Sequence, residues 1–273
     1  MIKLFVSDLD GTLLLRDEVR GSYLPDFNLQ AIHRLDEAGI RFAIASGRHQ
    51  IFLEMLLKQI ALPCDVIADN GAMVVIDGQP HLISLDREHC RLMATDYLSQ
   101  PFAASMPLEA ALVDGGCVRS AADPRPRTAP RRPGFYYRYD LETYFSDPTL
   151  PAAVKLINFV PKGGDIESWT WKMRDLYADY FDIYSSGFDA IEFMSPGIDK
   201  GYGLRMVMAQ HGLSSDEVAV IGDADNDISM MLQSNNAFAM ATGDPHIRKY
   251  CRYSAKTVAQ AIDDVIAANR QGR

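Results

Sequence analysis

Residues 2–12 read IKLFVSDLDGT. The first six form a short apolar, β-prone run, which predicts a buried strand. The strand is expected to stop at the segment DLDGT, where charge and a glycine indicate a turn. Side chains two residues apart lie on the same face of an extended chain, so the carboxylates of Asp8 and Asp10 are expected on one side. Two such carboxylates repel each other unless a cation or a shared proton holds them.

The same pattern of a strand followed by polar residues recurs along the chain. The expected strands after the first are residues 40–45, 65–68, 218–221 and 237–240, and a hairpin is expected over 73–83. Helical periodicity appears at 29–38, in a stretch up to about 58, and at 200–211, 228–233 and 257–269. Ser214 and Glu217 match a capping box ahead of a short helical turn. The alternation predicts an α/β fold with a Rossmann-like, doubly wound and mostly parallel sheet, in which ligands bind beyond the carboxyl ends of the strands.

The rhythm changes in the middle of the chain, which predicts an inserted domain. Helical segments at 87–100 and 167–180 are joined there by short strand-like runs, a mixture typical of an α+β unit. We therefore expect a core built from residues 1–84 and 195–273, with an α+β cap at 85–194.

Two groups of side chains in this cap have a functional and a structural interpretation. The arginines of the Pro/Arg-rich segment 119–138 could bind an anionic substrate, but such a segment is more often a solvated loop; they are Arg119, Arg125, Arg127, Arg131, Arg132 and Arg138. A group of aromatic residues is interpreted as cap core rather than a base-stacking platform: Trp169, Trp171, Tyr177, Tyr180 and Phe181.

Composition limits the classes of partner. The 273 residues are 48% hydrophobic and 23% charged, as in ordinary soluble proteins, and the net charge of −9 gives no basic footprint for nucleic acid. The four cysteines are widely spaced without a C-x-x-C motif, which argues against a zinc site or a disulfide framework. No apolar run approaches the ~18 residues of a membrane span. A cytoplasmic protein with a small-molecule ligand is expected, and the oligomeric state stays open.

A second acidic cluster follows the strand expected at 218–221. It contains Asp223, Asn226 and Asp227. If its strand lies beside the first one, three or four carboxylates meet at one edge of the sheet, and oxygen ligands of this kind suit Mg²⁺ at about 2.0–2.1 Å. Either cluster alone is more often a turn or a helix cap, but together with Ser46 and Lys200 they favour a functional site.

The motifs together resemble the four signatures of the haloacid-dehalogenase-like (HAD) hydrolase superfamily. The segment DLDGT at 8–12 is similar to the first, Ser46 in ASGR to the second, Lys200 in DKG to the third, and Asp223 to Asp227 in GDADND to the fourth. They occur in the family's order and cover both ends of the chain. The insertion resembles a type-two cap, and with the NGA segment at 70–72 the pattern is closest to the Cof-type phosphatases.

This resemblance implies a Mg²⁺-dependent phosphatase of small phosphorylated metabolites, such as a sugar phosphate or a phosphorylated cofactor, acting through an aspartyl-phosphate. Asp8 would be the nucleophile, Asp10 the general acid and base, and Lys200 the balancing charge. The implied metal ligands are Asp8, Asp10 through its backbone carbonyl, Asp223 and Asp227. The implied phosphate-binding residues are Ser46, Gly47, Asn70, Lys200 and Asn226.

Plainer interpretations exist for single residues and for the function. Alone, Ser46 is more often a helix N-cap, Lys200 a solvated first-turn residue, and Asn70 part of a simple turn. Arg48 is interpreted as a surface helix residue rather than a substrate contact. A phosphomutase of the same superfamily or a non-catalytic metabolite-binding protein stays open as an alternative. A dehalogenase is disfavoured because Asp10 has no evident role in displacing halide.

Overall fold

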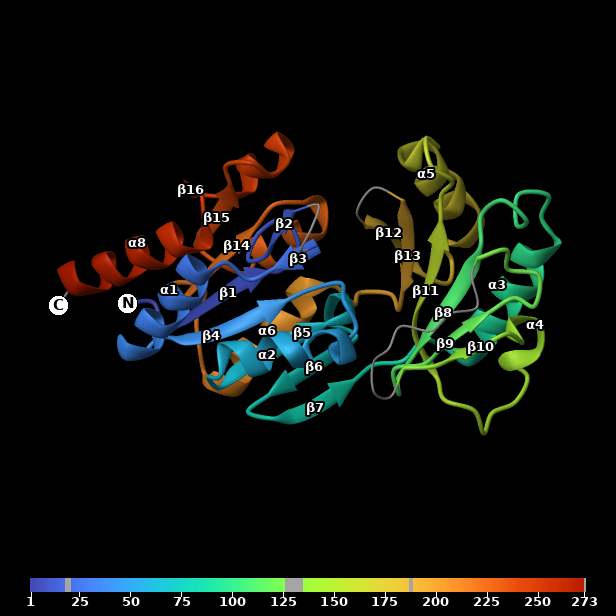
Figure 1. Ribbon diagram of the computed structural model, residues 1–273, viewed down its shortest axis with the longest axis horizontal. Coiled ribbons are helices and arrows are strands. Elements are labelled where there is room, and N and C mark those ends of the chain that lie inside the picture. Colours follow the sequence, from blue (N-terminus) through green and yellow to red (C-terminus); the bar gives the residue numbers. More distant parts are fainter. Residues whose placement is uncertain (18–20, 126–134, 187–188, 273) are drawn as a thin grey trace. The chain divides into compact units, whose positions relative to one another are not determined.

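The computed structural model describes residues 1–17, 21–125, 135–186 and 189–272 (Figure 1). The chain forms two compact units. The core unit contains Met1–His81 and Asp199–Arg273, and the cap unit contains Leu82–Ile198. The chain thus leaves the core unit and returns to it, at junctions a few residues from those expected at 84/85 and 194/195.

The core unit is built on an eight-stranded sheet in the order β16-β15-β14-β1-β4-β5-β6-β7. All neighbouring pairs from β16 to β5 are parallel, and β6 is antiparallel to β5. Strand β1 lies between β14 and β4, so the segments that follow these three strands lie at one edge. The strands are β1 (Leu4–Asp8), β4 (Arg41–Ala45), β5 (Cys64–Ala68), β6 (Met73–Ile76), β7 (Gln79–Leu82), β14 (Val218–Gly222), β15 (Asn236–Met240) and β16 (Tyr253–Ala255).

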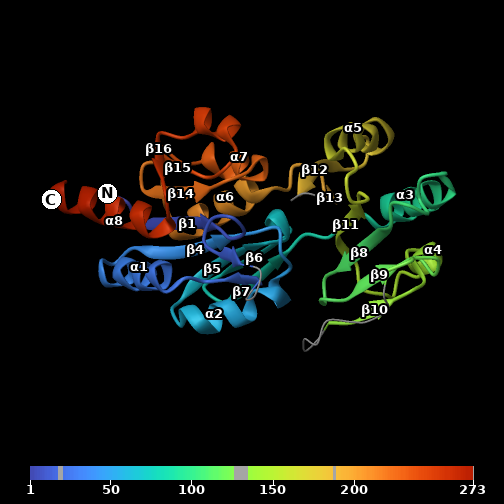
Figure 2. The same ribbon diagram turned by 45° about the horizontal axis from the view of Figure 1, so that its top comes forward.

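Helices cover both faces of this sheet, as can be followed in Figure 2. Successive side chains of β1 point to opposite faces. Phe5 packs in one cluster with residues of α1 (Asp26–Glu37) and α8 (Val258–Gln271). Val6 packs in another with residues of α6 (Lys200–His211) and α7 (Ile228–Met231). The expected doubly wound α/β class is confirmed.

Shorter elements complete the core unit. They are η1 (Gln50–Phe52), α2 (Glu54–Ile60), η2 (Asp69–Gly71), η3 (Asp225–Asp227), η4 (Pro245–Tyr250) and a hairpin of β2 (Leu15–Asp17) with β3 (Gly21–Tyr23). The helical turn expected after Ser214 is wrong, because β14 begins at Val218 and leaves room only for a turn. Only one bond of the expected capping box is present: the Glu217 carboxylate accepts the Ser214 N–H at 3.0 Å, whereas the Glu217 N–H donates to the Ser214 backbone carbonyl at 3.0 Å instead of the side chain.

The cap unit has its own sheet and hydrophobic cluster. The six strands follow the order β10-β9-β8-β11-β13-β12 and are antiparallel except for the pair β9 and β10. They are β8 (Leu108–Leu112), β9 (Cys117–Arg119), β10 (Tyr137–Arg138), β11 (Ala153–Phe159), β12 (Asp182–Ser186) and β13 (Ala190–Met194). The helices α3 (Arg87–Ser99), α4 (Leu141–Tyr144) and α5 (Ile166–Tyr177) contribute to one cluster with the sheet.

The three arginines of segment 119–138 that the structure describes pair with carboxylates, which differs from the expected solvated loop. Arg119 lies in β9 with 7% exposure and donates to Glu109 at 2.9 Å and to the Tyr137 hydroxyl at 2.7 Å. Arg125 pairs with Asp123 at 2.6 Å, and Arg138 pairs with Asp140 at 2.5 Å. Arg119 and Arg125 are thus held within the cap unit, whereas the side chain of Arg138 is 38% exposed. Arg127, Arg131 and Arg132 lie outside the described residues.

The aromatic group is cap core only in part. Tyr177 and Phe181 are buried, and Trp169 and Tyr180 pack against the same cluster. Trp171 is 57% exposed, so its assignment to the core is wrong. Helix α5 buries one stripe, Thr170, Met173 and Tyr177, at a spacing of three and four residues, and Trp171 lies outside that stripe.

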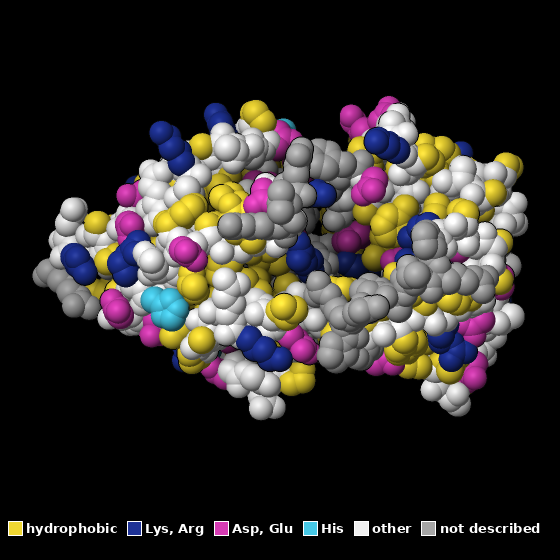
Figure 3. All heavy atoms as spheres, in the orientation of Figure 1, with side chains coloured by type: hydrophobic (Ala, Val, Ile, Leu, Met, Phe, Trp, Pro, Cys, Tyr) yellow, Lys and Arg dark blue, Asp and Glu magenta, His cyan; other side chains and the backbone are white. Residues whose placement is uncertain are grey.

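The composition predicts neither a basic surface for nucleic acid nor a membrane-spanning segment, and two observations bear on these expectations. On the face shown in Figure 3, acidic and basic side chains are interspersed rather than gathered by sign. None of the helices in the described part of the chain is long and apolar enough to cross a membrane.

Candidate active site

Three carboxylates meet where β1 and β14 end. Asp8 is the last residue of β1, Asp223 directly follows β14, and Asp227 ends η3. One carboxylate oxygen of each lies within 4.8 Å of the other two. These residues are far apart in the chain, but β1 and β14 are parallel neighbours, so their carboxyl ends share one edge of the sheet.

A glycine permits the close approach of the two loops. Gly11 has φ +84°, and a Cβ at this position would lie 2.3 Å from Oδ2 of Asp223. The next residue, Thr12, is buried and donates its hydroxyl proton to Oδ1 of Asp223 at 3.1 Å. Only glycine therefore fits between β1 and the second acidic loop.

Asp8 and Asp10, expected on one face from the spacing of two, differ in their exposure and in their partners. Strand β1 ends at Asp8 and the chain turns, so the alternation of an extended chain no longer applies. Asp8 is 5% exposed, whereas the side chain of Asp10 is 50% exposed. The Asp10 carboxylate is instead held by Arg48, with Nε at 2.7 Å and the second guanidinium contact at 2.5 Å.

Arg48 is the residue near the site that the sequence interpretation missed. It was expected on a surface helix, but it precedes η1, and its backbone N–H donates to Oγ of Ser46 at 3.1 Å. Its guanidinium forms a two-point contact with Asp10, the geometry that favours arginine over lysine. No local sequence pattern signals this pair, because it joins loops that follow two different strands, β1 and β4.

Lys200 lies in the middle of the acidic group. It is the first residue of α6 and is 1% exposed, which rules out the solvated interpretation. Its Nζ lies 2.6 Å from Oδ1 of Asp8 and 2.6 Å from Oδ1 of Asp227. Burial opposes the charge of Lys200, but the carboxylates of Asp227 and Asp8 outweigh this effect and raise the lysine's pKa.

The site carries an excess of negative charge. Burial, with the charge of Asp227 added to it, raises the pKa of Asp8 well above its usual value. The same two causes raise the pKa of Asp223. When all are ionised, three carboxylates and one ammonium sum to −3 + 1 = −2. A divalent cation would balance this charge, and a set of carboxylate oxygens fits Mg²⁺.

Asp227 differs from the other two carboxylates in how much of it is already engaged. Its Oδ1 accepts from Lys200, and its Oδ2 accepts the backbone N–H groups of Asp223 at 2.9 Å and Ala224 at 3.1 Å. It is completely buried. Asp227 therefore fixes Lys200 and the turn that carries Asp223, and it has less capacity left for a cation than Asp8 or Asp223.

The polar residues predicted to bind phosphate form a continuous group next to Arg48. Ser46 is 1% exposed and is no N-cap, since His49 caps η1. The backbone N–H of Asn70 donates to the Ser46 carbonyl at 3.0 Å, and a Cβ on Gly47 would lie 3.3 Å from the Asn70 amide. Nδ2 of Asn226 lies 3.5 Å from Oδ1 of Asn70. The core unit thus brings the predicted residues of three loops together.

A second cluster of metal-ligating side chains in the described residues is engaged internally. It comprises Asp65, Asp77 and His211. Nε2 of His211 lies 2.7 Å from Oδ2 of Asp65, whose Oδ1 accepts the Asp77 N–H at 3.0 Å. Asp77 also pairs with Arg41 at 3.2 Å. This network ties α6 to β5 at its amino-terminal end, away from the carboxylates around Asp8.

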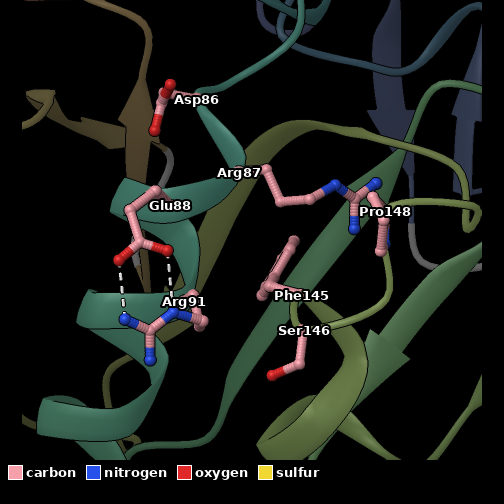
Figure 4. A pocket seen from close by; sticks show the side chains of 7 residues that line it. All are labelled: Asp86, Arg87, Glu88, Arg91, Phe145, Ser146 and Pro148. Atoms are coloured by element: carbon pink, nitrogen blue, oxygen red, sulfur yellow. Dashed lines mark hydrogen bonds and ion pairs between the residues drawn. The ribbon is translucent and has the colours of Figure 1, made fainter.

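The cap unit has a recess of about 570 Å³ on its surface (Figure 4). Arg91 pairs there with Glu88 at 2.6 Å. Arg87 donates to the backbone carbonyls of Asp147 at 2.9 Å and Leu150 at 2.5 Å. The cations of this recess therefore already have partners. Its lining residues are Asp86, Arg87, Glu88, Arg91, Phe145, Ser146 and Pro148.

Comparison with known proteins agrees with the motifs. The sequence profile of the haloacid dehalogenase-like hydrolases matches residues 5–266. The chain belongs to this family. The predicted family and the predicted hydrolase class are thereby confirmed for this HAD-like hydrolase.

Individual relatives of this HAD-like hydrolase cover nearly its whole length. The HMP-PP phosphatase of Cronobacter sakazakii is 27% identical over 249 residues, which are 90% of this chain and 87% of the relative. The 5-amino-6-(5-phospho-D-ribitylamino)uracil phosphatase of Escherichia coli is 25% identical over 278 residues, or 97% and 96% of the two chains. The structure of a HAD/COF-like hydrolase from Plasmodium vivax superposes with a TM-score of 0.79 at 18% identity, over 98% of this chain and 96% of that one.

Proposed function

We propose that this HAD-like hydrolase is a Mg²⁺-dependent phosphatase of small phosphorylated metabolites that acts through an aspartyl-phosphate on Asp8. The observation that carries the proposal is the buried carboxylate of Asp8, held by Lys200 at 2.6 Å with Asp223 and Asp227 beside it. Two relatives that carry the names of phosphatases of small phosphate esters support it.

Asp8 is the nucleophile in this proposal. Lys200 holds Oδ1, which leaves Oδ2 to attack phosphorus. The new bond joins Oδ2 to phosphorus while the bond from phosphorus to the ester oxygen breaks. Covalent catalysis of this kind divides one difficult displacement into two easier ones. Water then attacks the aspartyl-phosphate and releases inorganic phosphate with the Asp8 carboxylate.

Asp10 is the general acid and base. It protonates the leaving oxygen in the first step and accepts a proton from the attacking water in the second, a contribution of about 10²–10⁴-fold. Its exposed carboxylate, two residues after the nucleophile, suits this role. Arg48 holds the carboxylate before substrate binds and can turn to the phosphate oxygens, which it binds with the same two-point geometry.

Asp8, Asp223 and the backbone carbonyl of Asp10 would hold Mg²⁺, with Asp227 assisting directly or through water. When bound, the ion neutralises charge so that an anionic carboxylate can approach an anionic phosphate. Lys200, Ser46 and the loop around Asn70 would bind the phosphoryl oxygens, with Gly47 and Asn226 completing the group.

A screen of phosphate esters tests this function. The purified protein with Mg²⁺ is incubated with a panel of sugar phosphates and phosphorylated vitamin precursors, and released inorganic phosphate is measured. Asp8→Asn serves as the control for contaminating phosphatase. Turnover that needs Mg²⁺ and Asp8 supports the proposal. A requirement for a bisphosphate activator without phosphate release would indicate a phosphomutase, and no turnover across the panel would favour a binding protein.

A further inference from the structure

Two loops at the edge of the core sheet are tied together by their backbones. One contains Ser46 and Arg48 and follows β4; the other contains Asp69 and Asn70 and follows β5. The Asp69 N–H donates to the Arg48 carbonyl at 3.0 Å, and the Asn70 N–H donates to the Ser46 carbonyl at 3.0 Å. A displacement of one loop is therefore passed directly to the other.

The second loop is held in an uncommon conformation. Asp69 has φ +47°, Asn70 has φ +50° and Gly71 has φ +98°. A Cβ on Gly71 would lie 2.2 Å from the carbonyl oxygen of Asp199, which places the loop against the residue before Lys200. Aspartate and asparagine tolerate left-handed backbone better than other non-glycine residues, and residues in this conformation gather at functional sites.

A buried histidine faces a buried carboxylate across these loops. The side chain of His49 is 9% exposed, that of Asp69 is 0% exposed, and Nε2 of His49 lies 3.8 Å from Oδ2 of Asp69. Nδ1 of His49 accepts the Ile51 N–H at 3.2 Å, so in the neutral ring the proton is on Nε2 and points toward Asp69. A closer approach by about 1 Å would bring the two atoms to hydrogen-bond distance.

We propose that His49 and Asp69 are a positioning pair that holds the phosphate-binding loops in their working arrangement. His49 directly follows Arg48, and Asp69 directly precedes Asn70, so the contact between Nε2 and the carboxylate, 3.8 Å apart, links the positions of both loops. The pair touches no reacting atom and acts through Ser46, Arg48 and Asn70. The inference rests on the proposed function for its catalytic meaning.

The histidine has a second contact, which makes the test sharp. As the N-cap of η1, His49 uses Nδ1; as the partner of Asp69, it uses Nε2. Asparagine at this position keeps an acceptor close to the backbone for the Ile51 N–H but cannot reach Asp69. Glutamine is longer and can place an amide N–H near the position of Nε2. The two variants therefore separate capping from positioning.

His49→Asn and His49→Gln are compared with the wild type by KM, kcat, the inhibition constant of inorganic phosphate and thermal unfolding. We expect His49→Asn to weaken phosphate inhibition and raise KM about tenfold, because the shorter amide cannot contact the Asp69 carboxylate, with kcat lowered less. We expect His49→Gln to stay within about threefold of the wild type. If His49→Gln loses more phosphate affinity than His49→Asn, His49 only caps η1. If both variants match the wild type, the proposed pair is wrong.

Asp69→Asn supplies a second test that keeps the backbone conformation, because asparagine tolerates a left-handed φ. If the two side chains act through each other, the double variant His49→Asn with Asp69→Asn binds phosphate as tightly as the single variant with the lower affinity. Multiplied effects of the two substitutions would show independent actions and overturn the pair.

Direct binding separates this inference from the proposed function. Calorimetric titration of the resting protein with inorganic phosphate in the presence of Mg²⁺ requires no turnover. If the wild type binds phosphate but hydrolyses no ester, the phosphatase fails while a loss of binding in His49→Asn still supports the pair. If the wild type hydrolyses esters and His49→Asn binds phosphate equally well, the pair fails alone. A wild type that binds no phosphate would contradict both.

Discussion

Lys200 and Asp8 form a buried ion pair with Nζ 2.6 Å from Oδ1 and side-chain exposures of 1% and 7%. The same ammonium group lies 2.6 Å from Asp227. Removing one partner of a buried pair leaves an uncompensated charge, which costs far more than the pair contributes as a whole. The proposed nucleophile and the stability of the core unit are thus linked through one lysine.

Asp8→Asn should abolish phosphate release without lowering the stability of the metal-free protein. Burial and the charge of Asp227 raise the pKa of Asp8 above its ordinary 3.8. Because the pKa is higher in the folded state than in the unfolded chain, ionisation of Asp8 lowers the free energy of unfolding. This loss grows as pH rises above 3.8. The amide removes this cost, and Lys200 keeps Asp227. Thermal unfolding at pH 7 in EDTA measures the effect, and a marked decrease in Tm would contradict the charge distribution described above.

Lys200→Met should abolish activity and also destabilise the metal-free protein. Asp8 and Asp227 would then lie buried without a counter-charge, a loss of about 3–5 kcal/mol. Urea unfolding in EDTA gives the free energy of unfolding. Lys58→Met, at an exposed position of α2, is the matched control and should change stability by less than about 0.5 kcal/mol. Similar values for the two variants would argue against the buried pair.

Gly11→Ala should weaken Mg²⁺ binding by about tenfold or more. A tenfold rise in Kd corresponds to a loss of only ~1.4 kcal/mol of binding free energy. The added Cβ would lie 2.3 Å from Oδ2 of Asp223, so the carboxylate must move. Gly39→Ala has the same backbone strain, with φ +74°, but a Cβ there meets no atom within 4 Å. Both variants should lose some stability, and only Gly11→Ala should change the Mg²⁺ affinity measured by calorimetry. Equal affinities would separate Gly11 from the metal site.

Glu217 should contribute stability that depends on pH. Its hydrogen bonds with Lys3 and with Ser214 lower its pKa from 4.5 to about 2. A depressed folded-state pKa adds stability that is fully present above the unfolded value and is lost as pH falls through the folded value. Glu217→Gln should therefore be less stable than the wild type at pH 6, with the difference vanishing between about pH 4.5 and about 2. Chemical unfolding over this range measures it, and a difference independent of pH would contradict the assignment.

Much of the core unit could be predicted because its signals are local. The observed bounds of α6 equal those expected from periodicity, and Gly212 ends α6 in a left-handed conformation. In the cap unit, β8, β9 and β11 were not resolved from the sequence. Each carries a charged residue that the fold buries beside a partner on another strand or loop, such as Lys155 with Glu192 at 2.9 Å. Such charges interrupt the apolar pattern that identifies a buried strand.

By itself the sequence determined the doubly wound core, the inserted cap and the carboxylates and lysine that gather at the end of β1. The tertiary structure alone decided that Asp10 pairs with Arg48, and that His49 faces Asp69. These contacts join loops that follow different strands, and their distances depend on the order of β1, β4 and β5 in the sheet. Periodicity encodes which segments form strands, but only the assembled sheet brings the side chains beyond their ends within bonding distance.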